Sequence, residues 1–334
     1  MKSRIYRAKQ NPKRNNLVLL GLLALLSLAP VFGQSYPPNT TLQSQATPFL
    51  NRPSYLAPIN DPSFNTNVVR ISDQDAFSAP DKLDLRHAYS RVSAWNSDGT
   101  KIALSGTYPT PILNGNTYAL IYKASTIPTN ARWSNTNPNI MYGIEYGTNK
   151  FETWNVNTQV KIVLRDFTQY DPGTLSIGNG EGSTSNDDRY VVFHAKSGAA
   201  NYIIVFDILN NVIVSALNTG TVEANNATIS QLGNHVVIQW GANGYNFMQG
   251  VDVYNKNLVF QRKIHTNGFA HFDAGIDTAG NEVIAYQKNT ETNSTKRKPY
   301  MFRLDTIQET DLLGATAIEM APDYHVSCRN IARP

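Results

Sequence analysis

Residues 185–217 read SNDDRYVVFHAKSGAANYIIVFDILNNVIVSAL and contain three short apolar runs, at 190–193, 202–206 and 212–217. The runs consist mainly of β-branched and aromatic residues, and turns rich in Ser, Gly, Asn and Asp separate them. Runs of this length with such boundaries are typical of strands, and Asn and Asp suit tight turns because they tolerate a left-handed backbone. The stretch therefore predicts three strands of one small antiparallel sheet.

The same unit recurs along the chain. The turn before the first long strand carries an equivalent residue at four places, with gaps of 89, 45 and 47 residues: Gly99, Asp188, Gly233 and Gly280. The gap of 89 covers two periods, and the unit between them falls at 132–142. A second marker, an aromatic residue or Leu followed by Asn or Asp, occurs at 154–155, 206–207, 254–255 and 304–305. Two markers that keep similar spacing indicate a repeat of about 40–50 residues.

A repeat of this length with several strands per unit is typical of the blades of a β-propeller. The predicted fold class is all-β, a β-propeller of four-stranded antiparallel blades, with about five blades and the start of a sixth. The expected blades lie at 86–125, 131–167, 185–217, 227–264 and 271–313. An all-β sandwich with evenly spaced hairpins is the alternative fold.

The segment 324–334 falls where a sixth blade would begin. Because open sheet edges favour aggregation, we expect an incomplete propeller from a seven- or eight-bladed parent. The alternative is a five-bladed ring, closed by a strand at 68–72 that pairs with the last blade.

Two motifs resemble those of a known family. The sequence SDGTKIAL at 97–104 and the segment WSNTNPNIMY at 133–142 are similar to the repeats of TolB-type, WD40-like propellers of bacterial envelopes. The resemblance covers residues 83–313 and implies the propeller fold. It does not specify an activity, because such propellers serve as scaffolds, receptors, peptidase domains and polysaccharide lyases.

The N-terminus has the pattern of a secretory signal peptide. Six basic residues and no acidic residue precede an apolar run at 17–32, and small or medium residues at 31–33 suit cleavage after Gly33. The expected organisation is a signal peptide at 1–33, an extended lead-in rich in Pro, Asn and Ser at 34–80, and the propeller at 81–334. We expect a secreted or periplasmic bacterial protein with no transmembrane segment after cleavage.

The charge of the mature chain bears on its partners. The full chain has 29 basic and 25 acidic residues, and removal of residues 1–33 leaves 23 basic and 25 acidic residues. This balance gives no reason to expect nucleic acid as a partner, so a polysaccharide or an envelope or extracellular protein is expected. Cys328 is the sole cysteine, which leaves no internal disulfide.

Propellers commonly bind ligands with the loops and strand starts at one mouth of the central channel. The equivalent segments are rich in His, Arg, Glu and Asn and lie at 86–89, 179–182, 223–226, 265–273 and 325–330. If the repeat register is right, these segments converge on one rim. The candidate ligand-binding residues are His87, Glu181, His265, Asp273 and Asn330.

Two functions follow from this rim. A binding or scaffold module needs no catalytic set and is the favoured interpretation, because His, Asp and Ser at such positions also satisfy buried turn amides. The alternative is a metal-assisted uronate lyase, which needs a base near neutrality and a cation that stabilises the enolate. His271, His325 and Arg329 are its catalytic candidates, and His265, His271 and His325 are candidate ligands of a divalent metal. Propeller oligogalacturonate lyases are similar in using rim histidines around a metal.

Overall fold

The computed structural model describes residues 50–62, 65–73, 75, 77, 85–89, 91–105, 109–240, 250–265, 272–289, 297–306 and 308–312. These residues belong to one compact unit, 43–333. The expectations for the signal peptide at 1–33 and for the segment 324–334 lie outside the described residues.

The stretch quoted first folds as expected. Its three apolar runs form β11 (Tyr190–Ser197), β12 (Ala200–Asp207) and β13 (Val212–Gly220). The preceding strand β10 (Ser176–Ile177) pairs with β11, so the sheet is an antiparallel meander in the order β10-β11-β12-β13. We call this sheet blade three.

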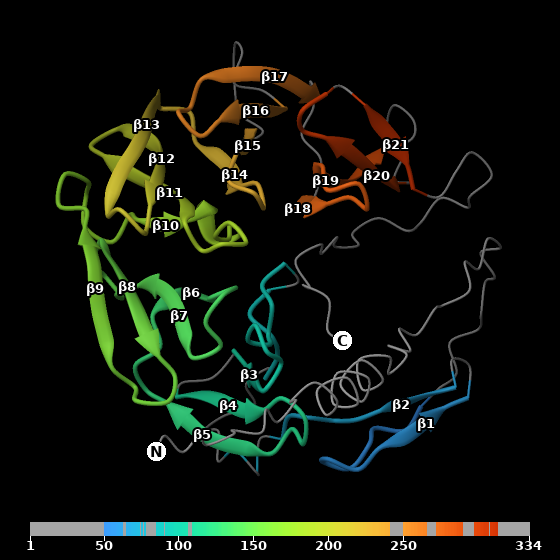
Figure 1. Ribbon diagram of the computed structural model, residues 1–334. Coiled ribbons are helices and arrows are strands. Elements are labelled where there is room, and N and C mark those ends of the chain that lie inside the picture. The colour runs from blue at the N-terminus through green and yellow to red at the C-terminus, as the bar shows by residue number, and fades with distance from the viewer. Residues whose placement is uncertain are drawn as a thin grey trace, which may run out of the picture. The chain divides into compact units, whose positions relative to one another are not determined.

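The other blades repeat this meander. Blade one consists of β3 (Lys101–Ala103), β4 (Thr110–Asn114) and β5 (Leu120–Ala124), and blade two of β6 (Thr129–Trp133), β7 (Ile140–Ile144), β8 (Lys150–Asn155) and β9 (Lys161–Asp166). Blade four consists of β14 (Ala224–Ile229), β15 (His235–Trp240), β16 (Val251–Asn255) and β17 (Phe260–His265). Blade five consists of β18 (Phe272–Ile276), β19 (Glu282–Asn289), β20 (Arg297–Arg303) and β21 (Glu309–Asp311). In each blade the sheet order follows the sequence order. Figure 1 shows the blades along an arc, with the first strand of each toward its centre and the last strand outside. The predicted all-β propeller of antiparallel blades is confirmed.

The residues that marked the repeat share one backbone conformation. Gly99, Asp188, Gly233 and Gly280 have φ angles of 73°, 57°, 78° and 84°. This left-handed region is open to Gly and, at some cost, to Asn and Asp, because they have no Cβ or a short polar side chain. The requirement for a left-handed turn before β3, β11, β15 and β19 therefore explains the periodic Gly or Asp.

The core lies between neighbouring blades. Along β11, Val191 and Phe193 pack in a cluster with blade two, whereas Tyr190 and Val192 pack in a cluster with blade four. Successive residues of a strand point to opposite faces, so a strand between two blades buries both faces. This explains why 190–193 is continuously apolar rather than alternating.

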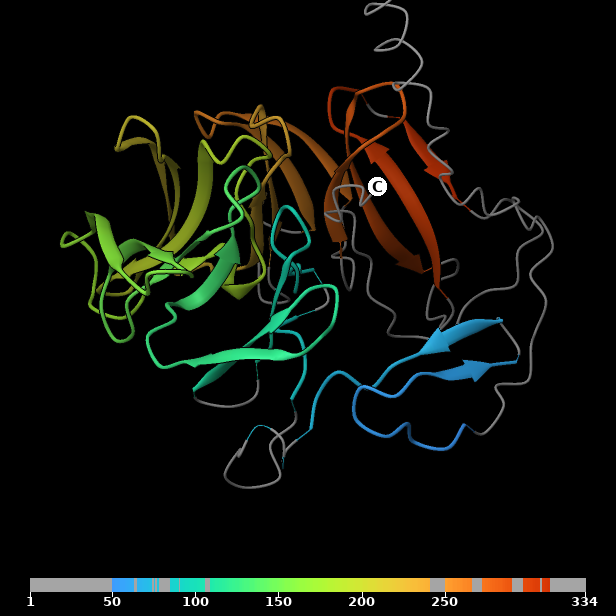
Figure 2. The same ribbon diagram turned by 60° about the horizontal axis from the view of Figure 1, so that its bottom comes forward.

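The segment expected to hold a closing strand, 68–72, overlaps a strand at one residue only, Val68. β2 (Thr66–Val68) pairs with β1 (Ile59–Asp61) in an antiparallel hairpin, drawn in blue in Figures 1 and 2. Arg70 forms a further bridge with Tyr55. Within the described residues, neither strand joins the sheet of blade five, which has the order β18-β19-β20-β21.

Asp188 joins blade three to blade two. Its carboxylate accepts hydrogen bonds from Ser134 Oγ (2.6 Å), the Asn135 N–H (3.0 Å), the Thr136 N–H (2.9 Å) and Thr136 Oγ1 (2.7 Å), and from Thr184 Oγ1 (3.0 Å) within its own blade. Only 5% of Asp188 is exposed. The turn of blade two is therefore held by charge-assisted hydrogen bonds to the buried Asp188 carboxylate, which we call the hub.

Replacement of this hub should be costly. Asp188→Asn keeps the shape and tolerates the left-handed backbone, but an amide accepts fewer of these hydrogen bonds and removes the charge. The expected loss in the free energy of unfolding is about 2–3 kcal/mol, measured by urea denaturation. Asp98→Asn, at an exposed turn, is the control and should cost less than about 0.5 kcal/mol. Equal effects of the two substitutions would contradict the role of the hub.

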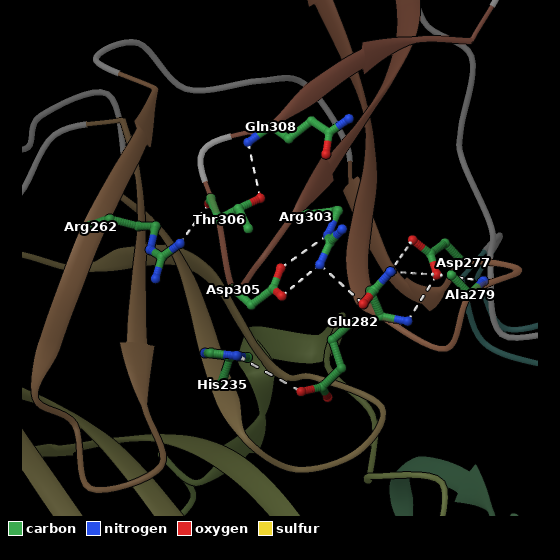
Figure 3. A network of polar contacts seen from close by, with 10 residues as sticks. His235, Arg262, Asp277, Ala279, Glu282, Arg303, Asp305, Thr306 and Gln308 are labelled. Atoms are coloured by element: carbon green, nitrogen blue, oxygen red, sulfur yellow. Dashed lines mark hydrogen bonds and ion pairs between the residues drawn. The ribbon is translucent and has the colours of Figure 1, made fainter.

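Glu282 makes the corresponding contact between blades four and five. Its carboxylate accepts hydrogen bonds from the Leu232 N–H (2.6 Å) and Asn234 Nδ2 (3.0 Å), and its Oε2 lies 3.9 Å from His235 Nε2. Figure 3 shows this pair beside the other polar contacts of the two blades. Burial lowers the pKa of His235, although the charge of Glu282 acts in the opposite direction. The network serves to hold the two blades together.

Within the part of the chain that the structure describes, no helix is long and apolar enough to cross a membrane.

Candidate functional site

Three of the predicted rim segments place a polar residue at one repeat position. Glu181, Asn226 and Asp273 each lie nine residues before the first residue of the second strand of their blade, in blades three, four and five. Asn226 is fully buried and Asp273 is 3% exposed. Neither polar atom of the Asn226 side chain has a hydrogen-bond partner among the described residues. We call these three residues the inner polar positions.

Arg91 connects two of these blades to the segment before blade one. Its guanidinium forms an ion pair with Glu181 and donates a hydrogen bond to the carbonyl of Phe272, the residue before Asp273. It also lies 5.5 Å from the centroid of the Phe272 ring, and the Arg91 side chain is only 2% exposed. The Arg91 guanidinium is thus buried and bonded on several sides, whereas the Glu181 side chain is 28% exposed, and this arrangement suits a structural contact.

A second arginine fixes the loop that carries Glu181. Arg132 Nε donates to the Gly182 carbonyl (2.7 Å) and Nη2 donates to the Gly180 carbonyl (2.6 Å). Gly178 in this loop has a φ of 52°, and a Cβ there would lie 2.2 Å from the Ala227 carbonyl oxygen. Only glycine allows the loop to approach blade four so closely. We call residues 178–182 the inner loop.

A cavity of about 350 Å³ lies between blades one and two. Its walls include Tyr89, Asn130, Arg132 and Trp133, together with Gly180 of the inner loop. Tyr89 is half-buried, and its ring centroid lies 5.8 Å from the Arg91 guanidinium carbon. The cavity combines aromatic walls with amide and hydroxyl groups, a composition that is common in small-ligand sites.

A smaller cavity of about 60 Å³ lies between blade three and the start of blade four. His194, Lys196 and Tyr202 of blade three line it with Glu223 and with Asn179 of the inner loop. Burial lowers the pKa of His194 to about 3, so the imidazole is neutral at physiological pH. The inner loop therefore contributes to the walls of both cavities.

The remaining predicted site residues are distributed as follows. His87 is exposed and lines a third cavity, of about 300 Å³, with Ile71 and Trp95. His265 ends β17, the outer strand of blade four, where it pairs with Val251. The predicted residues that lie outside the described part of the chain are His271, His325, Arg329 and Asn330.

Metal binding depends on how these residues gather. Among the described residues, no three His, Cys, Asp or Glu side chains lie close enough to hold a metal ion. Of the three histidines predicted as metal ligands, His265 alone is described. The described residues therefore do not by themselves fit a divalent metal.

The sequence analysis missed Arg91 and the role of Tyr89. The segment 86–89 was predicted to lie on the rim, but Arg91 follows it by two residues. The repeat itself could have indicated Arg91. Position 92 lies nine residues before β3 and so corresponds to the inner polar positions, and Arg91 is next to it.

Comparisons with known proteins agree with this architecture. An oligogalacturonate lyase in complex with manganese is 12% identical over 77% of this chain and 71% of that protein, with a TM-score of 0.56. The oligogalacturonate lyase of Vibrio parahaemolyticus is 12% identical over 80% of this chain and 73% of that protein, with a TM-score of 0.57. TolB from Acinetobacter baumannii is 12% identical over 72% and 55%, with a TM-score of 0.39. No protein-family model and no curated protein sequence matches the chain.

At this level of identity the likeness concerns the fold alone. The meander topology, the repeated left-handed turn and these structural relatives define the class of protein: the chain is a β-propeller. The propeller fold that the sequence resemblance implied agrees with the two lyase structures.

Proposed function

We propose that the chain is a secreted or periplasmic binding module and that its ligand is a glycan. The observation that carries the proposal is the cavity of about 350 Å³ beside the inner loop. Small-molecule sites commonly have volumes of about 300–1,000 Å³, so the cavity has room for one or two sugar rings.

The chemistry of the walls favours a sugar. A pyranose has an apolar C–H face, which packs against an aromatic ring, and an edge of hydroxyl groups, which need donors and acceptors. Tyr89 supplies aromatic surface, and Trp133, which is 6% exposed, adds the edge of a buried ring. Ser93, Thr110 and Asn130 supply hydroxyl and amide groups. The Trp133 indole N–H is already bonded to the Ala94 carbonyl (3.0 Å), so its ring is held in place.

A protein partner fits this cavity less well. Stable protein–protein interfaces bury about 800 Å² on each partner, mostly over flat surfaces, whereas this site is concave and small. The scaffold function therefore predicts a partner that covers a wider face, and a glycan is the ligand that the cavity suits.

Substitution of Tyr89 tests the proposal. Tyr89→Ala removes an aromatic wall of the cavity and should weaken binding of the strongest ligand from a glycan array at least about tenfold, measured by isothermal titration calorimetry. Tyr146→Ala is the matched control, because Tyr146 is an 86% exposed tyrosine on another turn. Its affinity should stay within about twofold of the unmodified protein. Equal affinities of the two variants, or no binding to any glycan, would refute the proposal.

A uronate lyase is the second candidate, because the two most similar structures reported above are oligogalacturonate lyases, one of them with manganese. In that case a rim histidine would remove the proton next to the carboxylate, and a cation would stabilise the enolate. Arg91 is poorly suited to bind the substrate carboxylate, because Glu181 and the Phe272 carbonyl already engage it. Ultraviolet absorbance of unsaturated product from uronate polymers, lost on chelation and in His271→Ala, would establish this function instead.

Export is part of the proposal and rests on the pattern at 1–33. A mature protein that begins at Gln34 when it is recovered outside the cytoplasm would support it, and retention of residues 1–33 would not.

A further inference from the structure

The small cavity beside His194 carries a second inference. His194 lines this cavity, and only 8% of the residue is exposed. The imidazole Nε2 is buried and has no hydrogen-bond partner among the described residues. A buried polar group without a hydrogen-bond partner is uncommon and costs free energy, which points to a molecule bound in the cavity.

The mouth of the cavity has no net charge. Lys196 Nζ lies 3.4 Å from Glu223 Oε2, and both side chains are about half exposed, at 47% and 55%. Burial keeps His194 neutral at physiological pH. A charged ligand would therefore be attracted by one member of the Lys196–Glu223 pair and repelled by the other. This arrangement favours a neutral ligand.

The same pair suits hydroxyl groups. A hydroxyl can accept a hydrogen bond from an ammonium and donate one to a carboxylate at the same time. Asn201 adds an amide, and the Tyr202 ring adds an aromatic wall held edge-on to Tyr170, with ring centroids 5.2 Å apart. The cavity of about 60 Å³ has room for one or two water molecules or for one hydroxymethyl group, but not for a whole sugar ring.

From these observations we infer that this cavity is a subsite for the hydroxyl-bearing edge of a neutral sugar, and that the Lys196–Glu223 pair selects against uronates. The inference rests on the proposed glycan-binding function and extends it to the class of glycan. The inner loop links the two sites, because Asn179 lines the small cavity and Gly180 lines the large one.

The test compares a neutral sugar with its acidic analogue. The full chain is titrated with galactobiose and with digalacturonate, and the expected affinity for the neutral disaccharide is at least about tenfold higher. Glu223→Gln removes the like charge that repels a carboxylate and leaves Lys196 free to bind it. This variant should lower the ratio of the two affinities by about three- to fivefold, because both side chains are half exposed. Since Glu223 is exposed, the fold should tolerate the change.

Glu145→Gln is the matched control. Glu145 forms an exposed ion pair of the same kind with Lys150, at 3.0 Å, in blade two, and its removal should leave the ratio unchanged. Equal ratios in Glu223→Gln and Glu145→Gln, or a preference of the unmodified protein for digalacturonate, would overturn the inference.

The two proposals fail in different ways. If Tyr89→Ala abolishes binding while Glu223→Gln leaves the ratio unchanged, the glycan-binding function stands and the subsite is refuted. If neither disaccharide nor any array glycan binds, both are refuted.

Discussion

Replacement of Arg91 by Met is expected to lower the free energy of unfolding by roughly 2–4 kcal/mol. Met keeps much of the apolar stem, so the loss comes from the guanidinium. Without it, Glu181 is left with a charge that has lost its partner, and the Phe272 carbonyl loses its donor. Removing one member of a pair of this kind costs more than the pair itself contributes, because the remaining charge on Glu181, with 28% of its side chain exposed, stays partly desolvated. Urea denaturation followed by circular dichroism measures the change.

A double-mutant cycle separates the ion pair from general packing. Glu181→Gln in the Arg91→Met background removes the unpaired charge, so the double variant should be more stable than Arg91→Met alone, with a coupling energy of about 1–3 kcal/mol. Additive effects of the two substitutions would contradict a direct contact between Arg91 and Glu181 of the inner loop.

The free energy of unfolding should fall steeply as the pH is lowered, because His194 is buried in the folded protein. Burial lowers the pKa of His194 from 6.5 to about 3 in the folded protein, whereas the unfolded chain takes up a proton near pH 6.5. The unfolded state thus binds more protons below pH 6.5, and stability is full above that pH and declines as the pH falls toward 3. The slope from this group is about 1.4 kcal/mol for each pH unit. His235 acts in the same direction, because burial lowers its pKa too.

Histidine variants isolate this contribution. In His194→Gln the dependence of the unfolding free energy on pH, measured between pH 7 and pH 4, should be shallower by about 1 kcal/mol for each pH unit. His87→Gln, which replaces an exposed histidine in the same way, is the control variant. An unchanged slope in His194→Gln would show that the imidazole is not held neutral by burial.

The fold was largely predictable from the sequence because each blade repeats local requirements. The left-handed turn selects Gly or Asp at 99, 188, 233 and 280, and burial on both faces selects continuous apolar strands such as 190–193. The partner of the strand at 66–68 was not predictable in this way. Its pairing with Ile59–Asp61 depends on a local hairpin that the repeat does not encode.

The candidate site was predictable only in part. The repeat register relates Glu181 to Asp273, since each lies nine residues before the second strand of its blade. The contact of Arg91 with Glu181 joins residues 90 positions apart in the sequence, and the cavity walls combine side chains of different blades. Such contacts depend on how the blades pack against each other, and spacing within one blade carries no information about them.

The central claim is that a glycan binds beside the inner loop. A crystal structure of the protein with the strongest ligand from a glycan array tests it most directly. The account predicts a sugar ring in the cavity between blades one and two, against Tyr89 and within reach of Asn130. A ligand seated elsewhere, with this cavity holding only water, would contradict it.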